Sequence, residues 1–184
     1  MTTLRTLLLL VILLGLVPVV GASAGQVASV CFEPGGACED VIVHEITGAR
    51  RQVLVQAFSF TSRPIGSALV AAWRRGVDVR LIVDGEQYAQ HGAEAQWCAR
   101  QGVTVAIDAP PGRYAHAHDK VMIIDGTRVI TGSYNPTAHA SDVNVENLVV
   151  LDGADVASQY VKHFSERARV SQPIAPTDRV QTSR

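Results

Sequence analysis

The chain has 184 residues with 16 basic and 17 acidic side chains, and its formal net charge is −1. This length is enough for one domain. The near balance of charge argues against a protein that coats nucleic acid with a broad basic face, and it favours a local phosphate site of modest affinity.

Residues 1–24 are predicted to be a signal peptide. Arg5 precedes an apolar run from Leu7 to Val20, and Ala22-Ser23-Ala24 fits the small-x-small rule for cleavage. The run is short for a membrane span, which needs about 20 apolar residues, and an uncleaved N-terminal anchor is the alternative. We therefore expect an exported bacterial protein, periplasmic or secreted, without stable membrane association after cleavage. Because cleavage removes only one charge, Arg5, the remaining chain would carry a net charge of −2.

Residues 25–170 are predicted to form one domain that begins with alternating strands and helices. Ser62 before Pro64 marks a helix start, and Gly76 marks the end of that helix. Strands that alternate with helices run parallel, with helical crossovers between them. The predicted elements of this half are a helix at 39–51, a strand at 52–60, a helix at 61–75, a strand at 77–83, a helix at 93–101 and a strand at 103–107.

The second half of the domain is predicted to contain a hairpin after a loop at 108–117. Asp125-Gly126 supplies the turn between two apolar runs. An α/β fold with a mixed sheet flanked by helices is therefore expected. The tail, 171–184, is polar with two prolines and is expected to be disordered. The predicted elements of this half are strands at 118–124, 127–133 and 146–151 and a helix at 154–170.

Cys31 and Cys38 flank a Pro-Gly-Gly turn, which would let their sulfurs approach each other. In an oxidising compartment such a pair persists as a disulfide, and closing this short loop would stabilise the fold by at most about 2–3 kcal/mol. The spacing alone does not decide whether this disulfide forms, because disulfide geometry cannot be read from a sequence. Cys98 falls in a predicted helix and is interpreted as a buried small hydrophobe.

The stretch from His118 to Asp125 reads H-x-K-x4-D and is the most informative in the chain. Side chains two apart on a strand share a face, so His118 and Lys120 should point the same way and Asp119 the opposite way. An imidazole can attack phosphorus or move a proton, and a neighbouring cation neutralises phosphate charge. The pair therefore suits chemistry on a phosphate ester.

Residues beyond this motif extend the pattern. Gly132-Ser133 and Asn135 follow it, and Glu146-Asn147 opens another apolar strand. This order resembles the phospholipase D superfamily, in particular its small bacterial endonucleases with one motif per chain. Residues 55–61 and 68–77 also resemble this group, so the likeness covers most of residues 30–165.

The resemblance implies a role for each of these residues. His118 would attack phosphorus and form a phosphohistidine that water then hydrolyses, while Lys120 would hold the non-bridging oxygens. Ser133 and Asn135 would donate hydrogen bonds to phosphate oxygens. Glu146 would accept a hydrogen bond from the far ring nitrogen of a catalytic histidine and so fix its tautomer. No cofactor is implied.

The neighbouring residues are interpreted as structural or are left without a role. Gly132 lets the backbone approach closely. Asp125 belongs to the family pattern but sits at a turn, where Asp is favoured on its own, so we interpret it as structural, with a supporting role behind the site as the alternative. His116 could be a spare acid or a phosphate contact, and no particular role is assigned to it. No metal site is expected at His116, His118 and Asp119, because no carboxylate cluster accompanies them.

These features predict a metal-independent phosphodiesterase, a nonspecific endonuclease that cleaves DNA, with RNA as a further substrate. The alternatives are a phospholipid-hydrolysing phospholipase D and a catalytically silent DNA-binding protein. The motif serves lipid and nucleic acid alike, but the chain beyond residue 24 lacks an obvious amphipathic interfacial helix, which disfavours lipid. The intact set of site residues and the negative net charge disfavour the silent protein.

The chain is also predicted to act as a homodimer. The mechanism needs two histidines, one as nucleophile and one as acid, whereas the chain has one H-x-K motif and no internal repeat. A two-fold axis would bring the same patch of both subunits together and place two His118 side chains across one phosphate. The competing idea is that His116 acts within the same chain, although residues two apart on a strand point in parallel rather than oppose each other.

Overall fold

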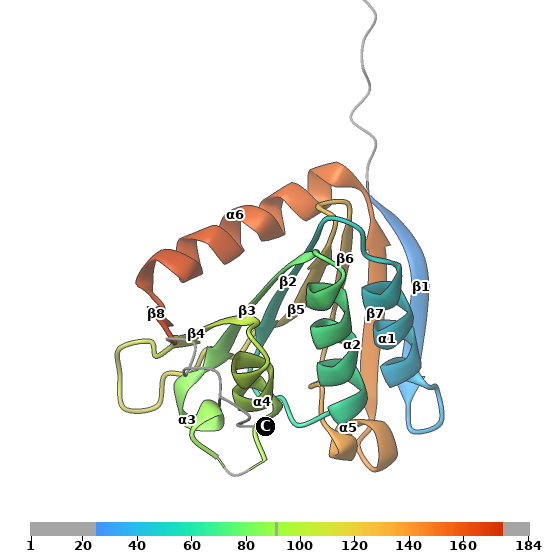
Figure 1. Cartoon of the computed structure of the whole chain (residues 1–184). Coiled ribbons are helices and arrows are strands. Elements are labelled where there is room, and N and C mark those ends of the chain that lie inside the picture. The colour runs from blue at the N-terminus through green and yellow to red at the C-terminus, as the bar shows by residue number, and fades with distance from the viewer. Residues whose placement is uncertain (1–24, 91, 175–184) are drawn as a thin grey trace, which may run out of the picture.

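The computed structural model describes residues 25–90 and 92–174, which form one eight-stranded mixed sheet with helices on both faces (Figure 1). The strand order is β1-β7-β6-β5-β2-β3-β4-β8. The predicted α/β fold with a mixed sheet flanked by helices is therefore confirmed. The predicted signal peptide, 1–24, and residues 175–184 of the predicted tail lie outside the described residues.

The elements alternate between strand and helix over the first half of the chain. The strands are β1 Gln26–Glu33, β2 Gln52–Ala57, β3 Asp78–Asp84, β4 Thr104–Asp108, β5 Lys120–Ile124, β6 Arg128–Gly132, β7 Glu146–Asp152 and β8 Gln172–Pro173. The helices are α1 Cys38–Gly48, α2 Arg63–Arg74, α3 Gly85–Tyr88, α4 Glu94–Arg100, α5 Ala138–Asp142 and α6 Ala154–Val170. Within the described ranges, no helix is both long and apolar enough to cross a membrane.

The strands β2, β3 and β4 form the parallel half of the sheet, with α2 and α4 in the crossovers, as predicted. Helix α2 begins at the predicted cap, because the Ser62 hydroxyl accepts a hydrogen bond from the Ile65 amide at 3.2 Å. Gly76 follows the helix with a φ of 90°, a left-handed conformation that glycine adopts without strain.

The central strands are buried on both faces, which explains why they read as continuous apolar runs. Val53 and Val55 of β2 belong to the larger core, together with residues of α1, α2 and α4. Leu54, between them, belongs to a smaller core that Ala157 and Phe164 of α6 complete. Figure 1 shows α6 crossing the sheet apart from the other helices.

The antiparallel half brings four strand ends to one place. Strands β5 and β6 form the predicted hairpin, and β7 pairs with β6. Lys120 at the start of β5 pairs with Ala57 at the end of β2, and Gly132 at the end of β6 pairs with Leu148 near the start of β7. Residues that lie far apart in the sequence therefore meet at this end of the sheet.

Two edge strands were not predicted. Strand β1 pairs antiparallel with β7, although Val30 and Phe32 are 53% and 64% exposed. The short strand β8 pairs with β4 through Gln172 and Ile107, so residues 171–174, which we assigned to a disordered tail, fold back onto the sheet. Both pairings join segments far apart in the sequence, and edge strands show little of the burial pattern that reveals a central strand.

The structure contains the Cys31–Cys38 disulfide, with 5.6 Å between the Cα atoms, and it joins β1 to the start of α1. The Glu33 carboxylate supports this turn by accepting hydrogen bonds from the amides of Gly36 at 2.9 Å and Cys38 at 2.6 Å. Cys98 is fully buried in α4. Burial raises the pKa of its thiol to about 12, with nearby Glu94 adding to the shift. A thiol of this kind is inert.

Candidate active site

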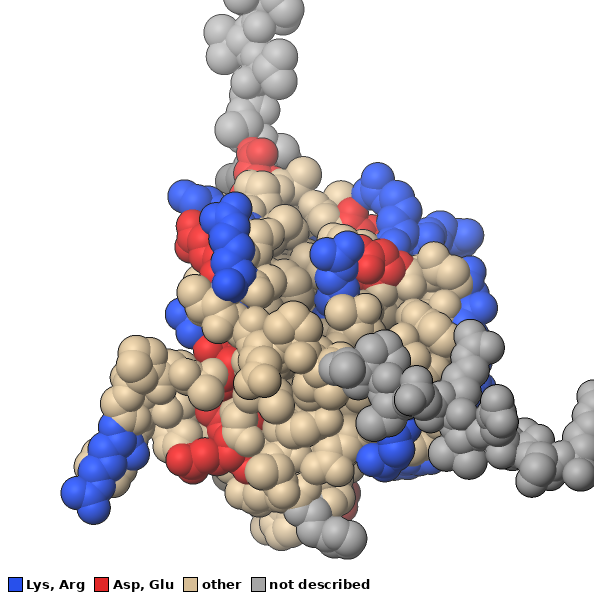
Figure 2. Space-filling view, turned by 60° about the vertical axis from the view of Figure 1, so that its left-hand side comes forward, with Lys and Arg blue, Asp and Glu red and all other residues tan. Residues whose placement is uncertain are grey.

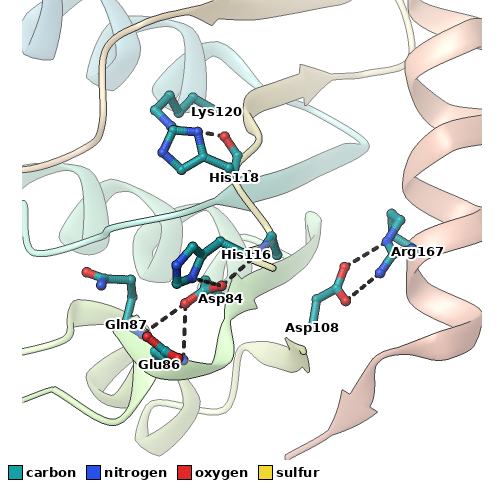
Figure 3. A network of polar contacts seen from close by, with 9 residues as sticks. Asp84, Glu86, Gln87, Asp108, His116, His118, Lys120 and Arg167 are labelled. Atoms are coloured by element: carbon teal, nitrogen blue, oxygen red, sulfur yellow. Dashed lines mark hydrogen bonds and ion pairs between the residues drawn. The ribbon is translucent and has the colours of Figure 1, made fainter. Parts of the chain in front are cut away.

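His118 and Lys120 lie together at the start of β5, as the spacing of the motif predicts. The Lys120 ammonium is 3.2 Å from Nδ1 of His118 and donates a hydrogen bond to the His118 carbonyl at 2.9 Å. Figure 3 shows the two side chains side by side on the segment that enters β5. An imidazole thus lies beside a cation, which is the arrangement that attack on a phosphate ester requires.

Phe58 forms an aromatic support for this pair, and the sequence did not single it out. Its ring centroid is 4.4 Å from that of His118 and 5.2 Å from the Lys120 ammonium. The Phe58 amide donates to the Asp119 carbonyl at 3.0 Å, which extends the pairing of β2 with β5 past the strand ends. Packing against a ring reduces the number of orientations that the imidazole and the ammonium can adopt.

Asp119 points toward α6, away from His118 and Lys120, as predicted. Its carboxylate accepts a hydrogen bond from the side-chain amide nitrogen, Nε2, of Gln56 at 3.1 Å and lies 3.1 Å from Nε2 of His163 on α6. These contacts tie the catalytic segment to the opposite face of the sheet, and neither Gln56 nor His163 carried a signal in the sequence.

The Lys120 ammonium is partly removed from water. Burial lowers its pKa below the ordinary value, and the negative charges of Asp119 and Glu146 oppose this shift. No carboxylate forms an ion pair with Lys120 in the part of the chain that the structure describes. A partly desolvated cation without a carboxylate partner is ready to bind a phosphate oxygen.

Ser133 and Glu146 lie side by side at the facing ends of β6 and β7. The Ser133 hydroxyl donates a hydrogen bond to the buried Glu146 carboxylate and accepts one from the Asn147 amide at 3.0 Å. The other carboxylate oxygen of Glu146 accepts from the Asn144 side chain at 3.0 Å. Within residues 25–90 and 92–174, no hydrogen bond joins Glu146 to His118, so its partners here are Ser133 and Asn144 rather than a histidine.

Gly132 and Asn135 complete this side of the site. Gly132 has a φ of 150°, and a Cβ placed on it would lie 2.2 Å from the Asn147 carbonyl oxygen, so only glycine allows the backbone of β6 to approach β7 here. The side-chain oxygen of Asn135 is buried and accepts no hydrogen bond within the described residues. A buried acceptor of this kind needs a donor, such as a water molecule, to complete its hydrogen bonding.

These residues surround an open groove of about 550 Å³ on the molecular surface. Four of the five residues expected to act on substrate reach it, and Glu146 lies behind Ser133. The groove is lined by His118, Asp119, Lys120, Val121, Thr131, Gly132, Ser133, Asn135 and Tyr160. Its open shape would accept an extended substrate.

Asp125 lies outside the groove, at the far end of β5. Its carboxylate accepts hydrogen bonds from the amides of Arg50, Arg51 and Gln52 at 3.0, 2.7 and 2.9 Å. Burial alone would raise its pKa, but these amide donors outweigh burial and hold the pKa below its ordinary value. Asp125 thus fastens the β5–β6 turn to the start of β2, the structural role that we preferred.

The charge around the site is mixed. Arginines pair with acids, as in the two contacts of 2.8 and 2.6 Å between Arg167 on α6 and Asp108 at the end of β4 (Figure 3). Figure 2 shows, on the face it presents, basic side chains interspersed with acidic ones. This distribution fits the expectation of a local phosphate site centred on Lys120.

Comparison with known proteins places the chain in a family. The model of the family described as "Cardiolipin synthase, PLD-like domain" matches residues 42–168. Phospholipase D of Rickettsia bellii is 36% identical over 139 residues, which is 76% of this chain and 68% of that protein. Mitochondrial cardiolipin hydrolase of Xenopus laevis is 34% identical over 120 residues, 65% of this chain and 56% of that protein.

A solved structure supports the same assignment. Nuc from Salmonella typhimurium, a phospholipase D family member, superimposes with a TM-score of 0.76 and 30% identity, over 82% of this chain and 99% of that chain. The family match, the identity and the common fold agree with the geometry around His118 and Lys120. The chain is therefore a member of the phospholipase D superfamily of phosphodiesterases.

Proposed function

We propose that the protein is a metal-independent, nonspecific endonuclease that cleaves DNA, and RNA by the same chemistry. The observation that carries this proposal is the His118–Lys120 pair at the floor of an open groove, 3.2 Å apart. The likeness to Nuc, which extends over 99% of that chain, adds support for a nuclease rather than another phosphodiesterase.

The chemistry would run in two steps through His118. In the first, a ring nitrogen of His118 bonds to phosphorus, the bond from phosphorus to the leaving oxygen breaks, and a second imidazole gives that oxygen a proton. In the second, water attacks phosphorus, the second imidazole takes its proton, and the phosphorus–nitrogen bond breaks. Lys120 would offset the charge that develops on the non-bridging oxygens.

We infer that the second imidazole is His118 of another copy of the chain. Val30 on β1 pairs with Val149, which pairs with Thr131 of the groove, and directly paired residues share a face of the sheet. The exposed side chains of Val30 and Phe32 therefore lie on the α6 face of the sheet with Thr131, about 10 Å from it at the usual strand spacing. The His118 ring reaches the same groove from beyond the start of β5. An isologous dimer across this face would cover apolar surface and oppose the two His118 rings.

Export is part of the proposal. The Cys31–Cys38 disulfide fits an oxidising compartment outside the cytosol, as does the apolar run that follows Arg5. N-terminal sequencing of the protein recovered from a bacterial periplasm or medium would test it. A first residue near Gly25 is expected, and an intact Met1 would contradict cleavage.

Cleavage of plasmid and single-stranded DNA in excess EDTA tests the nuclease directly. Wild-type protein should cut both, and His118→Ala should lower the rate by three orders of magnitude or more while the fold persists, because His118 is exposed. His44→Ala is a matched control, since His44 is also exposed and lies near Asp125 at the other end of β5. Activity lost in chelator and restored by a divalent metal would contradict the mechanism.

The second candidate function is phospholipid hydrolysis, which the curated relatives favour by their names, phospholipase D and cardiolipin hydrolase. Vesicles of phosphatidylcholine and of cardiolipin, assayed beside DNA, separate the two functions. Release of phosphatidic acid at a rate far above that of DNA cleavage would replace the nuclease proposal with the lipid one.

A further inference from the structure

A second histidine near the groove has a fixed acidic partner. Asp84, at the end of β3, is only 2% exposed. Its carboxylate accepts hydrogen bonds from the amides of Glu86 and Gln87, both at 3.1 Å, and from the amide of Ala117 at 2.9 Å. Figure 3 shows this carboxylate between the start of α3 and the segment that leads to His118.

His116 completes this arrangement. Its Nδ1 lies 3.6 Å from the same Asp84 oxygen that accepts from Ala117, and its side chain is 34% exposed. The Ala117 backbone amide and the His116 ring therefore both face the same buried carboxylate oxygen of Asp84. Its other nitrogen, Nε2, has no hydrogen-bond partner among the described residues.

The ring of Phe58 places His116 alongside the groove. The centroid of the Phe58 ring is 5.5 Å from that of the His116 ring and 4.4 Å from that of the His118 ring, so the two imidazoles pack against the same phenyl ring. Residues two apart on an extended segment are roughly 6.5–7 Å apart and point in parallel. This geometry does not oppose His116 to His118 across one phosphorus, but it suits contacts with two successive phosphates of a strand.

We propose that His116 binds a second phosphate of the substrate, next to the phosphate that His118 attacks. The proposal rests on the nuclease function and deepens it, because the substrate class becomes chains with at least two phosphodiesters. An imidazolium donates from both ring nitrogens: Nδ1 faces Asp84, and Nε2 is left to donate to a phosphate oxygen. Asp84 acts as a positioning residue that fixes the ring.

Kinetics on two substrates test this role. A single-stranded oligonucleotide offers neighbouring phosphates, whereas bis(p-nitrophenyl) phosphate has one phosphodiester only. His116→Ala should raise KM for the oligonucleotide about tenfold, the loss expected for one charge-assisted hydrogen bond, and leave kcat and the small substrate unchanged. His116→Lys should restore the KM for the oligonucleotide, and His44→Ala should leave KM and kcat unchanged for both substrates.

Binding without turnover gives an independent readout. In a His118→Ala background, fluorescence anisotropy should show about tenfold weaker oligonucleotide binding when His116→Ala is added. Asp84→Asn keeps an acceptor for the α3 amides but removes the charge that faces His116. It should weaken binding as well, and it should add little to His116→Ala, because the two residues act through one contact.

The possible outcomes distinguish the proposed His116 phosphate contact from the nuclease function on which it rests. Equal losses of kcat on both substrates in His116→Ala would make His116 the acid of the reaction and overturn the phosphate contact. Unchanged KM and unchanged anisotropy would also overturn it, while leaving the nuclease proposal intact. Wild-type protein that hydrolyses the small substrate but no oligonucleotide would overturn the nuclease proposal, and this one with it.

Discussion

His118 and Asp125, the first and last side chains of the H-x-K-x4-D motif, lie at opposite ends of β5, roughly 20 Å apart for an extended segment of this length. His118 lines the groove, and the Asp125 carboxylate accepts hydrogen bonds from backbone amides at the start of β2. One motif thus combines a residue that acts on the substrate with one that holds the strand in place.

Asp125→Ala is expected to lower stability and not turnover. It leaves the amides of Arg50, Arg51 and Gln52 without their acceptor, and it puts alanine at a φ of 54°. We expect a loss of about 1–3 kcal/mol in the free energy of unfolding by urea, with kcat unchanged for the folded protein. Asp125→Asn, which tolerates this φ and keeps an acceptor, should lose less. Reduced kcat at unchanged stability would place Asp125 in the chemistry instead.

Asp125 should also contribute to acid sensitivity. Its pKa is lower in the folded protein than its ordinary value of 3.8. Its stabilising contribution is therefore complete above that value and is lost as the pH falls through the lowered pKa. The free energy of unfolding, measured by urea titration at a series of acidic pH values, should decline less steeply for Asp125→Asn than for wild type. Parallel curves would show that another carboxylate is responsible.

Lys120 should set part of the alkaline limit of activity. Burial lowers the pKa of its ammonium, so the cation is lost at a pH below the 10.5 of an ordinary lysine. Lys120→Arg stays charged over this range and should show a weaker alkaline decline in kcat/KM for bis(p-nitrophenyl) phosphate, even if its maximum is lower. Lys162→Arg, at an exposed position on α6, is the control and should follow wild type. Superimposable alkaline limbs for Lys120→Arg and wild type would refute this assignment.

The dimer can be tested through its proposed apolar face. Val30→Glu should convert the protein to a folded monomer with little activity, because the second His118 is lost from the site. Val170→Glu makes the same change at another exposed valine, at the end of α6, and it should leave mass and activity unchanged. Light scattering gives the mass, and circular dichroism checks the fold. A fully active wild-type monomer would rule out the shared site.

The disulfide should stabilise the domain without acting in catalysis. Replacing both Cys31 and Cys38 with Ser should cost at most about 2–3 kcal/mol of unfolding free energy, and dithiothreitol should have the same effect on wild type. The double variant should not respond to dithiothreitol, whereas Cys98→Ala should respond as wild type does, because Cys98 is a buried free thiol. Stability that is insensitive to reduction would contradict the role of the bridge.

The sequence by itself determined the α/β class and most central elements, and it predicted His118, Lys120, Ser133 and Asn135, which the structure brings to one groove. Central strands are apolar because both of their faces are buried, and Ser62 with Pro64 marks a helix start, so local chemistry is sufficient there. The alternation of side chains along a strand also places His118 and Lys120 on one face. For these features the information lies within a few neighbouring residues.

Only the tertiary structure decided which partners those residues have. Glu146 bonds to Ser133 because β6 and β7 pair in one register, and Asp84 reaches His116 because β3 ends beside the segment that enters β5. Strand β1 went unrecognised because it gains its order from pairing with β7. Such contacts join segments far apart in the chain, and strand register arises from the packing of the whole sheet, which no local pattern of residues contains.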